Sequence, residues 1–148
     1  MQGTLRLKDN IYNIQAENDT RLYIMESDEN EGTLTVSVDI LFESGEYDGE
    51  DVTPYICINE HETNVSDVSE LAGKSFSVDN VDEADEREDT FYLFEHEPME
   101  RYKMTILEIE NDQMHIEIAG VAITDGYANP YKTDDFSIDC WLDIPKED

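Results

Sequence analysis

The chain has 148 residues, a length typical of one domain and short for two. Thirty-eight Asp and Glu residues against nine Lys and Arg give a formal net charge of −29, and 39% of the residues are hydrophobic. Nucleic acids and anionic membranes are bound by proteins that supply Lys and Arg, so we expect this chain to bind neither directly.

The excess of carboxylates has three explanations. A small soluble domain is well served by a net charge of magnitude about 2–8, so −29 exceeds the ordinary need. A salt-adapted surface favours Val, Ala and Thr, whereas this chain has more Ile than Val, few Ala and eight Tyr. Solubility alone and an acidic surface selected for a basic partner remain as the two explanations.

The ends and the cysteines indicate a compartment. Residues 1–7 contain no apolar core of a signal peptide, so we expect none. The longest uncharged apolar run, residues 118–123, is far shorter than the ~20 residues of a membrane helix. Two cysteines, Cys57 and Cys140, do not form a disulfide framework. We therefore expect a cytoplasmic protein.

Period-two alternation of apolar residues predicts that most of the chain is β-strand. In chain order we expect a hairpin over residues 4–15, a second over 20–43, and strands over 53–59, 75–79, 90–96, 101–110, 114–124 and 135–144. Short connections and half-polar strands are typical of antiparallel sheets. The sequence predicts a mainly β, single-domain antiparallel β-sandwich or barrel over residues 1–148, with about nine strands and one short helix.

Two segments depart from the β pattern. The short helix is expected at about residues 65–72, because Asn64 or Ser66 can cap it and Gly73 follows as a C-cap. Its apolar residues Val65, Val68, Leu71 and Ala72 share one face. Residues 79–89 contain seven acids against one Arg. We interpret residues 80–89 as a mobile acidic loop.

No catalytic or metal-binding pattern emerges. Residues 73–75 resemble the end of a phosphate-binding loop, but the earlier glycine that such a loop requires would fall at Val68. The acidic segments lack the spacing of a calcium loop, and the three histidines are far apart in the sequence. Neither cysteine has basic neighbours that would favour a thiolate. We expect no catalytic residue, no metal and no cofactor, and hence a protein that is not an enzyme.

The last strand-like segment divides into two faces. Phe136, Ile138, Cys140 and Leu142 alternate with polar residues and predict a core strand. On the other face Trp141, the only Trp, stands between two aspartates, where it either packs under another segment or anchors a partner. The candidate partner-binding residues are Asp139, Trp141 and Asp143, Tyr127 and Tyr131 in the preceding loop, and the acids Asp82, Glu83, Asp85, Glu86, Glu88 and Asp89.

Three functions fit these features. The first is a non-enzymatic, acidic inhibitor or immunity-type protein, or a nucleic-acid mimic, that masks a basic partner such as a nuclease or a nucleic-acid-binding protein. The second is a carbohydrate- or small-ligand-binding sandwich in which Trp141, Tyr127 and Tyr131 form a stacking platform with Asp143. The third is an acidic chaperone or scaffold. The sequence leaves the oligomeric state open.

Overall fold

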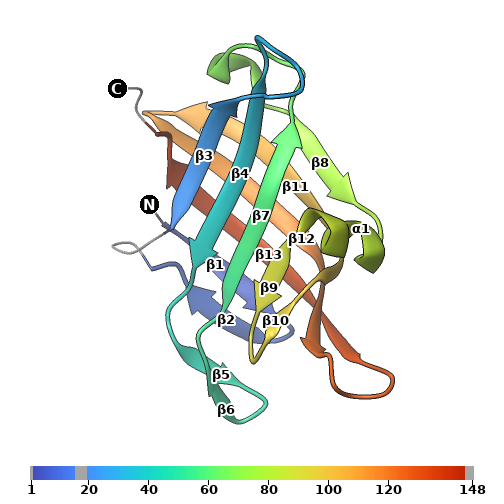
Figure 1. The fold of residues 1–148 in the computed structure, drawn as a ribbon. Helices are drawn as coiled ribbons and strands as arrows, with labels where there is room; N and C mark the ends of the chain where they lie inside the picture. Colours follow the sequence, from blue (N-terminus) through green and yellow to red (C-terminus); the bar gives the residue numbers. More distant parts are fainter. Residues whose placement is uncertain (1, 16–19, 146–148) are drawn as a thin grey trace.

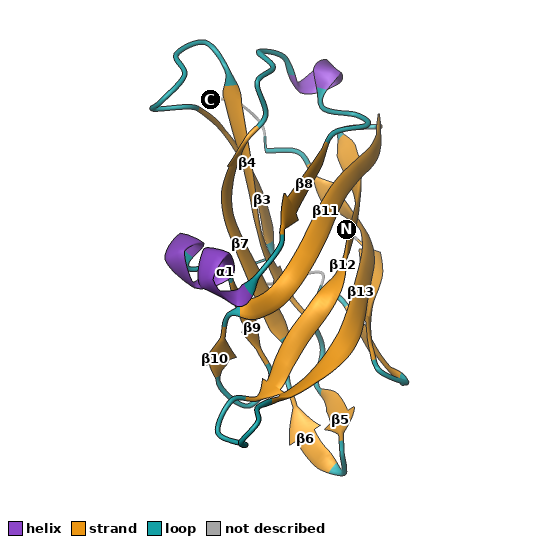
Figure 2. Cartoon of the chain, turned by 90° about the vertical axis from the view of Figure 1, so that its right-hand side faces the viewer, coloured by secondary structure: helices purple, strands orange, loops and turns teal. Residues whose placement is uncertain are grey.

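A computed structural model describes residues 2–15 and 20–145. Two antiparallel sheets pack face to face, as Figures 1 and 2 show. The prediction of a mainly β, antiparallel fold is confirmed. Over the described residues the sheets form a sandwich and do not close into a barrel. No helix in this part of the chain is long and apolar enough to cross a membrane.

The larger sheet has six strands, and each neighbouring pair is antiparallel. Its order is β2 (Asn10–Asn13), β1 (Gln2–Leu7), β13 (Lys132–Asp143), β12 (Gln113–Asp125), β11 (Met99–Glu110) and β8 (Ser75–Val78). The long strands β11, β12 and β13 form its centre. The N-terminal strand β1 pairs with the C-terminal strand β13 from Gln2 opposite Trp141 to Leu7 opposite Phe136, so both ends of the chain are held in one sheet.

The second sheet has five strands. Its order is β10 (His96–Glu97), β9 (Thr90–Tyr92), β7 (Tyr55–Glu62), β4 (Leu34–Leu41) and β3 (Arg21–Glu26). A separate hairpin, β5 (Gly45–Tyr47) and β6 (Glu50–Val52), lies in the segment expected to be a plain connection. Over the described residues the total is about 13 strands, against about nine expected. The hairpin adds two strands, and residues 90–97 form two short strands where one was expected.

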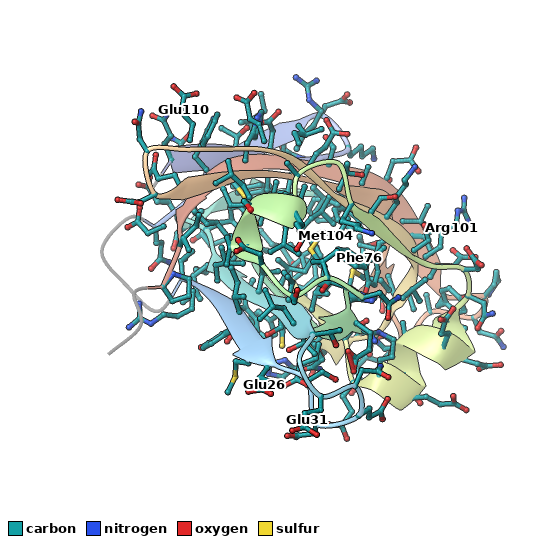
Figure 3. The ribbon with its side chains drawn as sticks, turned by 90° about the horizontal axis from the view of Figure 1, so that it is seen from above. Glu26, Glu31, Phe76, Arg101, Met104 and Glu110 are labelled. Atoms are coloured by element: carbon teal, nitrogen blue, oxygen red, sulfur yellow. The ribbon has the colours of Figure 1, made fainter. Side chains whose placement is uncertain are left out.

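The core lies between the two sheets and follows the predicted alternation. In β4, Val36, Val38 and Ile40 are fully buried, while the residues between them are partly exposed. In β13 the predicted inner residues Phe136, Ile138, Cys140 and Leu142 are all buried. Phe136 meets Phe91 of the opposite sheet with ring centroids 5.2 Å apart. Viewed along the sheets, Met104 lies in the interior, whereas Glu31 and Glu110 lie at the periphery (Figure 3).

The helix expected at residues 65–72 is reduced to one turn. The structure has a 3-10 helix, η1 (Val68–Glu70), capped by the Asp67 side chain. The segment cannot continue as a helix because its backbone joins β11: the Gly73 N–H donates to the Ile106 carbonyl at 2.8 Å, and the Ile106 N–H donates to the Lys74 carbonyl at 2.8 Å. Leu71 inserts into the core and is fully buried.

The expected acidic loop at residues 80–89 is instead the helix α1 (Val81–Arg87). Asn80 caps it by accepting a hydrogen bond from the Glu83 N–H, and the Glu83 carboxylate accepts one from the Asp79 N–H. The two bonds resemble a capping box, although Glu83 accepts from the residue before the cap rather than from Asn80 itself. Arg87 stands in the last turn, where a cation complements the helix dipole. The segment is therefore ordered by its caps despite its repelling charges.

Candidate functional site

The structure places Asp139, Trp141 and Asp143 on the outside of β13, as the alternation predicted. Trp141 is partly buried, because the His115 ring of β12 stacks on it with centroids 4.6 Å apart and planes inclined by 15°. His115 Nε2 lies 2.8 Å from the Asp139 carboxylate. Asp143 accepts a hydrogen bond from the Gln113 side chain at 2.8 Å. One face of the indole is thus already occupied within the chain.

Tyr127 and Tyr131 do not join this patch. They lie in the connection between β12 and β13, at the opposite end of β13 from Trp141 (Figure 1). At the rise of a β-strand, the stretch from Lys132 to Trp141 spans roughly 30 Å. Tyr127 is 84% exposed and Tyr131 is 42% exposed. A single stacking platform containing Trp141 and these tyrosines is therefore not formed.

The acids of residues 80–89 separate into two groups. Five belong to α1 or its C-cap and lie at or near the surface: Asp82, Glu83, Asp85, Glu86 and Glu88. The sixth, Asp89, is only 1% exposed. It was expected among the surface acids but belongs to the interior, so it is not available to a partner.

Asp89 anchors a buried polar network. One carboxylate oxygen accepts the Asn59 N–H at 2.8 Å, and the other accepts the Tyr102 hydroxyl at 2.6 Å and Arg87 Nε at 2.8 Å. The Tyr102 oxygen also lies 2.7 Å from His61 Nε2. Because the Tyr102 proton goes to Asp89, His61 Nε2–H donates to Tyr102. Burial, together with the Arg87 charge, lowers the pKa of His61 to about 4, although Asp89 opposes the shift.

The network serves the fold, since Asp89 and Tyr102 are buried and bond to each other and to Asn59, Arg87 and His61 within the chain. The two thiols are also poor nucleophiles: burial, reinforced by neighbouring aspartates, raises the pKa of Cys57 and of Cys140 to about 12. Among the described residues, no group of three or more His, Cys, Asp or Glu is placed to hold a metal ion.

A concave surface lies between the β5–β6 hairpin and the β12–β13 connection. Both segments project at the same end of the sandwich (Figures 1 and 2). We call this concave surface the acidic cleft. It has a volume of about 750 Å³ and gathers six carboxylates against two lysines. Its lining residues are Lys8, Tyr47, Asp48, Glu50, Phe94, Glu95, Glu97, Thr124, Asp125, Gly126, Tyr127, Lys132, Thr133 and Asp134.

Aromatic side chains form part of the cleft wall. Tyr47 is buried and its hydroxyl donates to the Asp134 carboxylate, which fixes the hairpin against β13. Phe94 packs beside Tyr47, with ring centroids 6.2 Å apart, and is still 37% exposed. With the exposed Tyr127, the cleft combines carboxylates with accessible ring faces. Both kinds of group attract cations.

The carboxylates of the cleft repel one another. Burial, with the charges of Glu95 and Asp125, raises the pKa of Glu97. The Glu97 carboxylate lies against Gly126, where an added Cβ would stand 1.7 Å from a carboxylate oxygen. A side chain at position 126 would therefore require the Glu97 carboxylate to shift. A cation entering the cleft would relieve the repulsion.

Sequence reasoning placed Tyr127 in the candidate site but missed the rest of the cleft. Its carboxylates come from four separate segments: β5–β6, the residues around β10, the end of β12 and the start of β13. Each alone looks like an ordinary surface acid in a chain where acids are common. Only the pairing of strands brings them together, and no local motif indicates it.

A comparison of the chain with protein-family models, with curated proteins and with solved structures gave no match.

Proposed function

We propose that this chain is a non-enzymatic binding domain whose acidic cleft binds and masks a basic surface of a partner protein. In this proposal the chain acts as an inhibitor or immunity protein, or as a nucleic-acid mimic, and its partner is a nuclease or a nucleic-acid-binding protein. One observation carries it: a concave site of about 750 Å³ holds six carboxylates together with exposed aromatic rings.

Physical reasons connect this geometry with a basic partner. A concave, low-dielectric wall focuses the field of its charges, so a cleft of one sign raises the association rate of an oppositely charged protein. Exposed Phe94 and Tyr127 provide the aromatic contacts that often dominate binding energy. The proposal takes the cytoplasm as the compartment, which suits two free thiols, Cys57 and Cys140.

Two variants of equal charge separate the cleft from the general acidity. The cleft variant carries Glu50→Gln, Glu95→Gln and Asp125→Asn. The control variant carries Glu31→Gln, Glu108→Gln and Glu110→Gln, all exposed and outside the cleft. Each removes three negative charges, so both have a formal net charge of −26 against −29.

Binding of a fluorescent nona-arginine peptide, followed by anisotropy at low salt, is the first measurement. At roughly 0.3–1 kcal/mol for each surface carboxylate, the cleft variant should bind about ten-fold more weakly, and the control variant should stay within about two-fold of the native chain. Equal weakening in both variants would show that net charge, not the cleft, attracts the peptide, and the proposal would fail.

The native partner is then sought by affinity capture from the source cell at low salt. The expected result is one basic protein, bound in a one-to-one ratio, which the control variant retains and the cleft variant loses. Recovery of the same mixture of basic proteins by all three forms would contradict a specific masking function.

A further inference from the structure

The carboxylates of the acidic cleft have no cation paired with them in the part of the chain that the structure describes. Both ion pairs found there lie outside the cleft, so neither Lys8 nor Lys132 pairs directly with a cleft carboxylate. Glu95 and Glu97 also accept no hydrogen bond from a described residue. The cleft therefore presents negative charge that a group from outside can neutralise.

Three of these carboxylates act on one another across two segments. Burial, followed by the charges of Glu95 and Asp125, raises the pKa of Glu97. The Glu97 carboxylate lies against Gly126, so the β10 segment and the connection after β12 meet at this point. Among the described residues, no three acids converge closely enough to hold a metal ion. The negative charge is thus spread along the cleft wall instead of being gathered at one point.

Two exposed aromatic side chains adjoin these acids and also line the cleft. Phe94 directly precedes Glu95 and is 37% exposed. Tyr127 directly follows Gly126 and is 84% exposed. The Tyr127 N–H donates to the Asp125 carboxylate at 3.0 Å, which fixes the backbone that carries this ring. Exposed ring faces beside separated carboxylates suit a cation that is flat and weakly hydrated.

We propose, building on the proposed masking function, that the cleft receives one arginine side chain of the partner. Its guanidinium lies among Glu95, Glu97 and Asp125, with the Tyr127 ring against its plane. A guanidinium presents five N–H donors in one plane, so it can serve several separated carboxylates and stack on a ring at the same time. A lysine ammonium is compact and strongly hydrated, and it gains less from this arrangement.

Two singly charged probes test the preference for arginine. N-acetyl-arginine methylamide and N-acetyl-lysine methylamide resemble residues within a chain and differ in the cationic head group. Each is titrated into the isotope-labelled full chain, and the NMR shifts of the backbone amides give both the affinity and the location. The arginine probe should shift residues 94–97 and 124–127 saturably and bind about five- to ten-fold more tightly than the lysine probe. Equal affinities, or shifts spread over the whole surface, would overturn the proposal.

A matched pair of variants tests the role of the ring. Tyr127→Ser should weaken binding of the arginine probe about three- to five-fold and change that of the lysine probe less than about two-fold. The control Tyr131→Ser removes an exposed ring of the same connection that does not line the cleft, and it should alter neither affinity more than about two-fold. Both positions are exposed, so neither substitution should disturb folding. Equal effects of the two substitutions would refute stacking on Tyr127.

A second pair tests the carboxylates. Glu95→Gln should weaken the arginine probe about two- to five-fold, because it removes one of the three charges around the guanidinium. Glu46→Gln removes the same charge from an exposed position of β5 that does not line the cleft, and it should leave the affinity unchanged. Equal weakening by both variants would show that net charge attracts the probe, and the proposal would fail.

Free arginine distinguishes a partner's side chain from a small ligand. It carries an α-carboxylate that Lys8 or Lys132 could bind, whereas the blocked probe has none. Free arginine should bind within about three-fold of the blocked probe. A larger gain for free arginine would assign the cleft to an amino acid and overturn the proposal.

The failure of arginine recognition is distinguishable from the failure of the masking function. If nona-arginine binding depends on the cleft while the arginine and lysine probes bind equally, the masking function stands and arginine recognition fails. If nona-arginine binding is insensitive to the cleft variant, the masking function fails as well.

Discussion

Replacing Asp89 with alanine removes the centre of the network that joins α1 to both sheets. The Asp89 side chain has no exposed surface, and its oxygens receive the Asn59 N–H, the Tyr102 hydroxyl and Arg87 Nε. Asn59 belongs to β7 of one sheet and Tyr102 to β11 of the other. Arg87 further donates to the carbonyls of Asn59 and Glu60 at 2.7 and 3.0 Å. The carboxylate thus fixes the position of α1 at the side of the sandwich.

The loss should be large because the substitution leaves a charge without its partner. The Arg87 side chain is 22% exposed, so water replaces the lost carboxylate only in part. Breaking a buried ion pair by removing one member costs about 3–5 kcal/mol. For a domain of this size each kcal/mol lowers Tm by about 2–4 °C, so a decrease of about 10 °C or more is expected.

Urea denaturation of the variant measures the free energy of unfolding directly. Asp85→Ala is the control, because Asp85 lies on the same helix but is exposed, and its removal should change stability by less than about 0.5 kcal/mol. Tyr102→Phe removes one hydroxyl from the network and should lower the free energy of unfolding by about 1–2 kcal/mol, between the effects of the two aspartate substitutions. Equal effects of the Asp89 and Asp85 substitutions would refute the assigned role of the buried carboxylate.

Three further predictions concern the interior. Burial lowers the pKa of His61 to about 4, so between pH 6.5 and 4 the unfolded chain binds a proton that the folded chain does not. Relative to the His61→Gln variant, the native chain should therefore lose about 3 kcal/mol of unfolding free energy on acidification through this range, as measured by urea denaturation. Unfolding free energies that fall in parallel with pH in the two proteins would contradict this. Gly120→Ala would place a Cβ 2.2 Å from the Arg101 carbonyl oxygen, so a loss of about 2–3 kcal/mol is expected, and an unchanged Tm would be the contrary result. Because burial raises the pKa of Cys57 and Cys140 to about 12, both should react slowly with a thiol reagent at pH 8 until the chain is denatured; fast labelling of the native protein would exclude this.

The sequence predicted those parts of the fold that depend on alternation. The inner residues of β4 and β13 were identified because a half-buried strand must alternate, and burial decides which face they take. The helix α1 was missed because its acids suggested a solvated loop. Its signal was present: Asn80 followed at the third position by Glu83 is a capping box, and Arg87 ends the segment. The density of acids predicts a loop at this segment, whereas its capping residues predict the helix that forms.

The opposite error occurred at residues 64–73. Val65, Val68 and Ala72 have helical spacing and Gly73 follows them, yet the backbone of this segment bonds to β11. Leu71 is buried by tertiary packing, which the spacing alone cannot distinguish from burial by a helix. A strand partner distant in sequence therefore overrode the local preference.

The acidic cleft and the outer side of the five-stranded sheet could not be predicted by the same means, because both depend on which segments become neighbours. The tyrosines at positions 23, 55 and 92 are isolated in the sequence and reach one side of the sheet only when β3, β4, β7 and β9 pair. The strand pairs of the five-stranded sheet thus determine its outer surface. The residues singled out in advance, such as Trp141, were those whose local context was unusual.

The distribution of charge bears on the remaining alternative, that acidity serves solubility alone. A surface shaped only by solubility has no reason to spare one sheet. The outward positions of β13 carry Asp135, Asp139 and Asp143, all exposed, whereas Tyr23, Tyr55 and Tyr92 stand on the outer side of the five-stranded sheet beside Arg21 and Asp39. In a chain of charge −29, exposed aromatic rings lower solubility, so a surface shaped for solubility alone would not keep them. The uneven distribution of charge therefore favours a surface that has a use besides solubility.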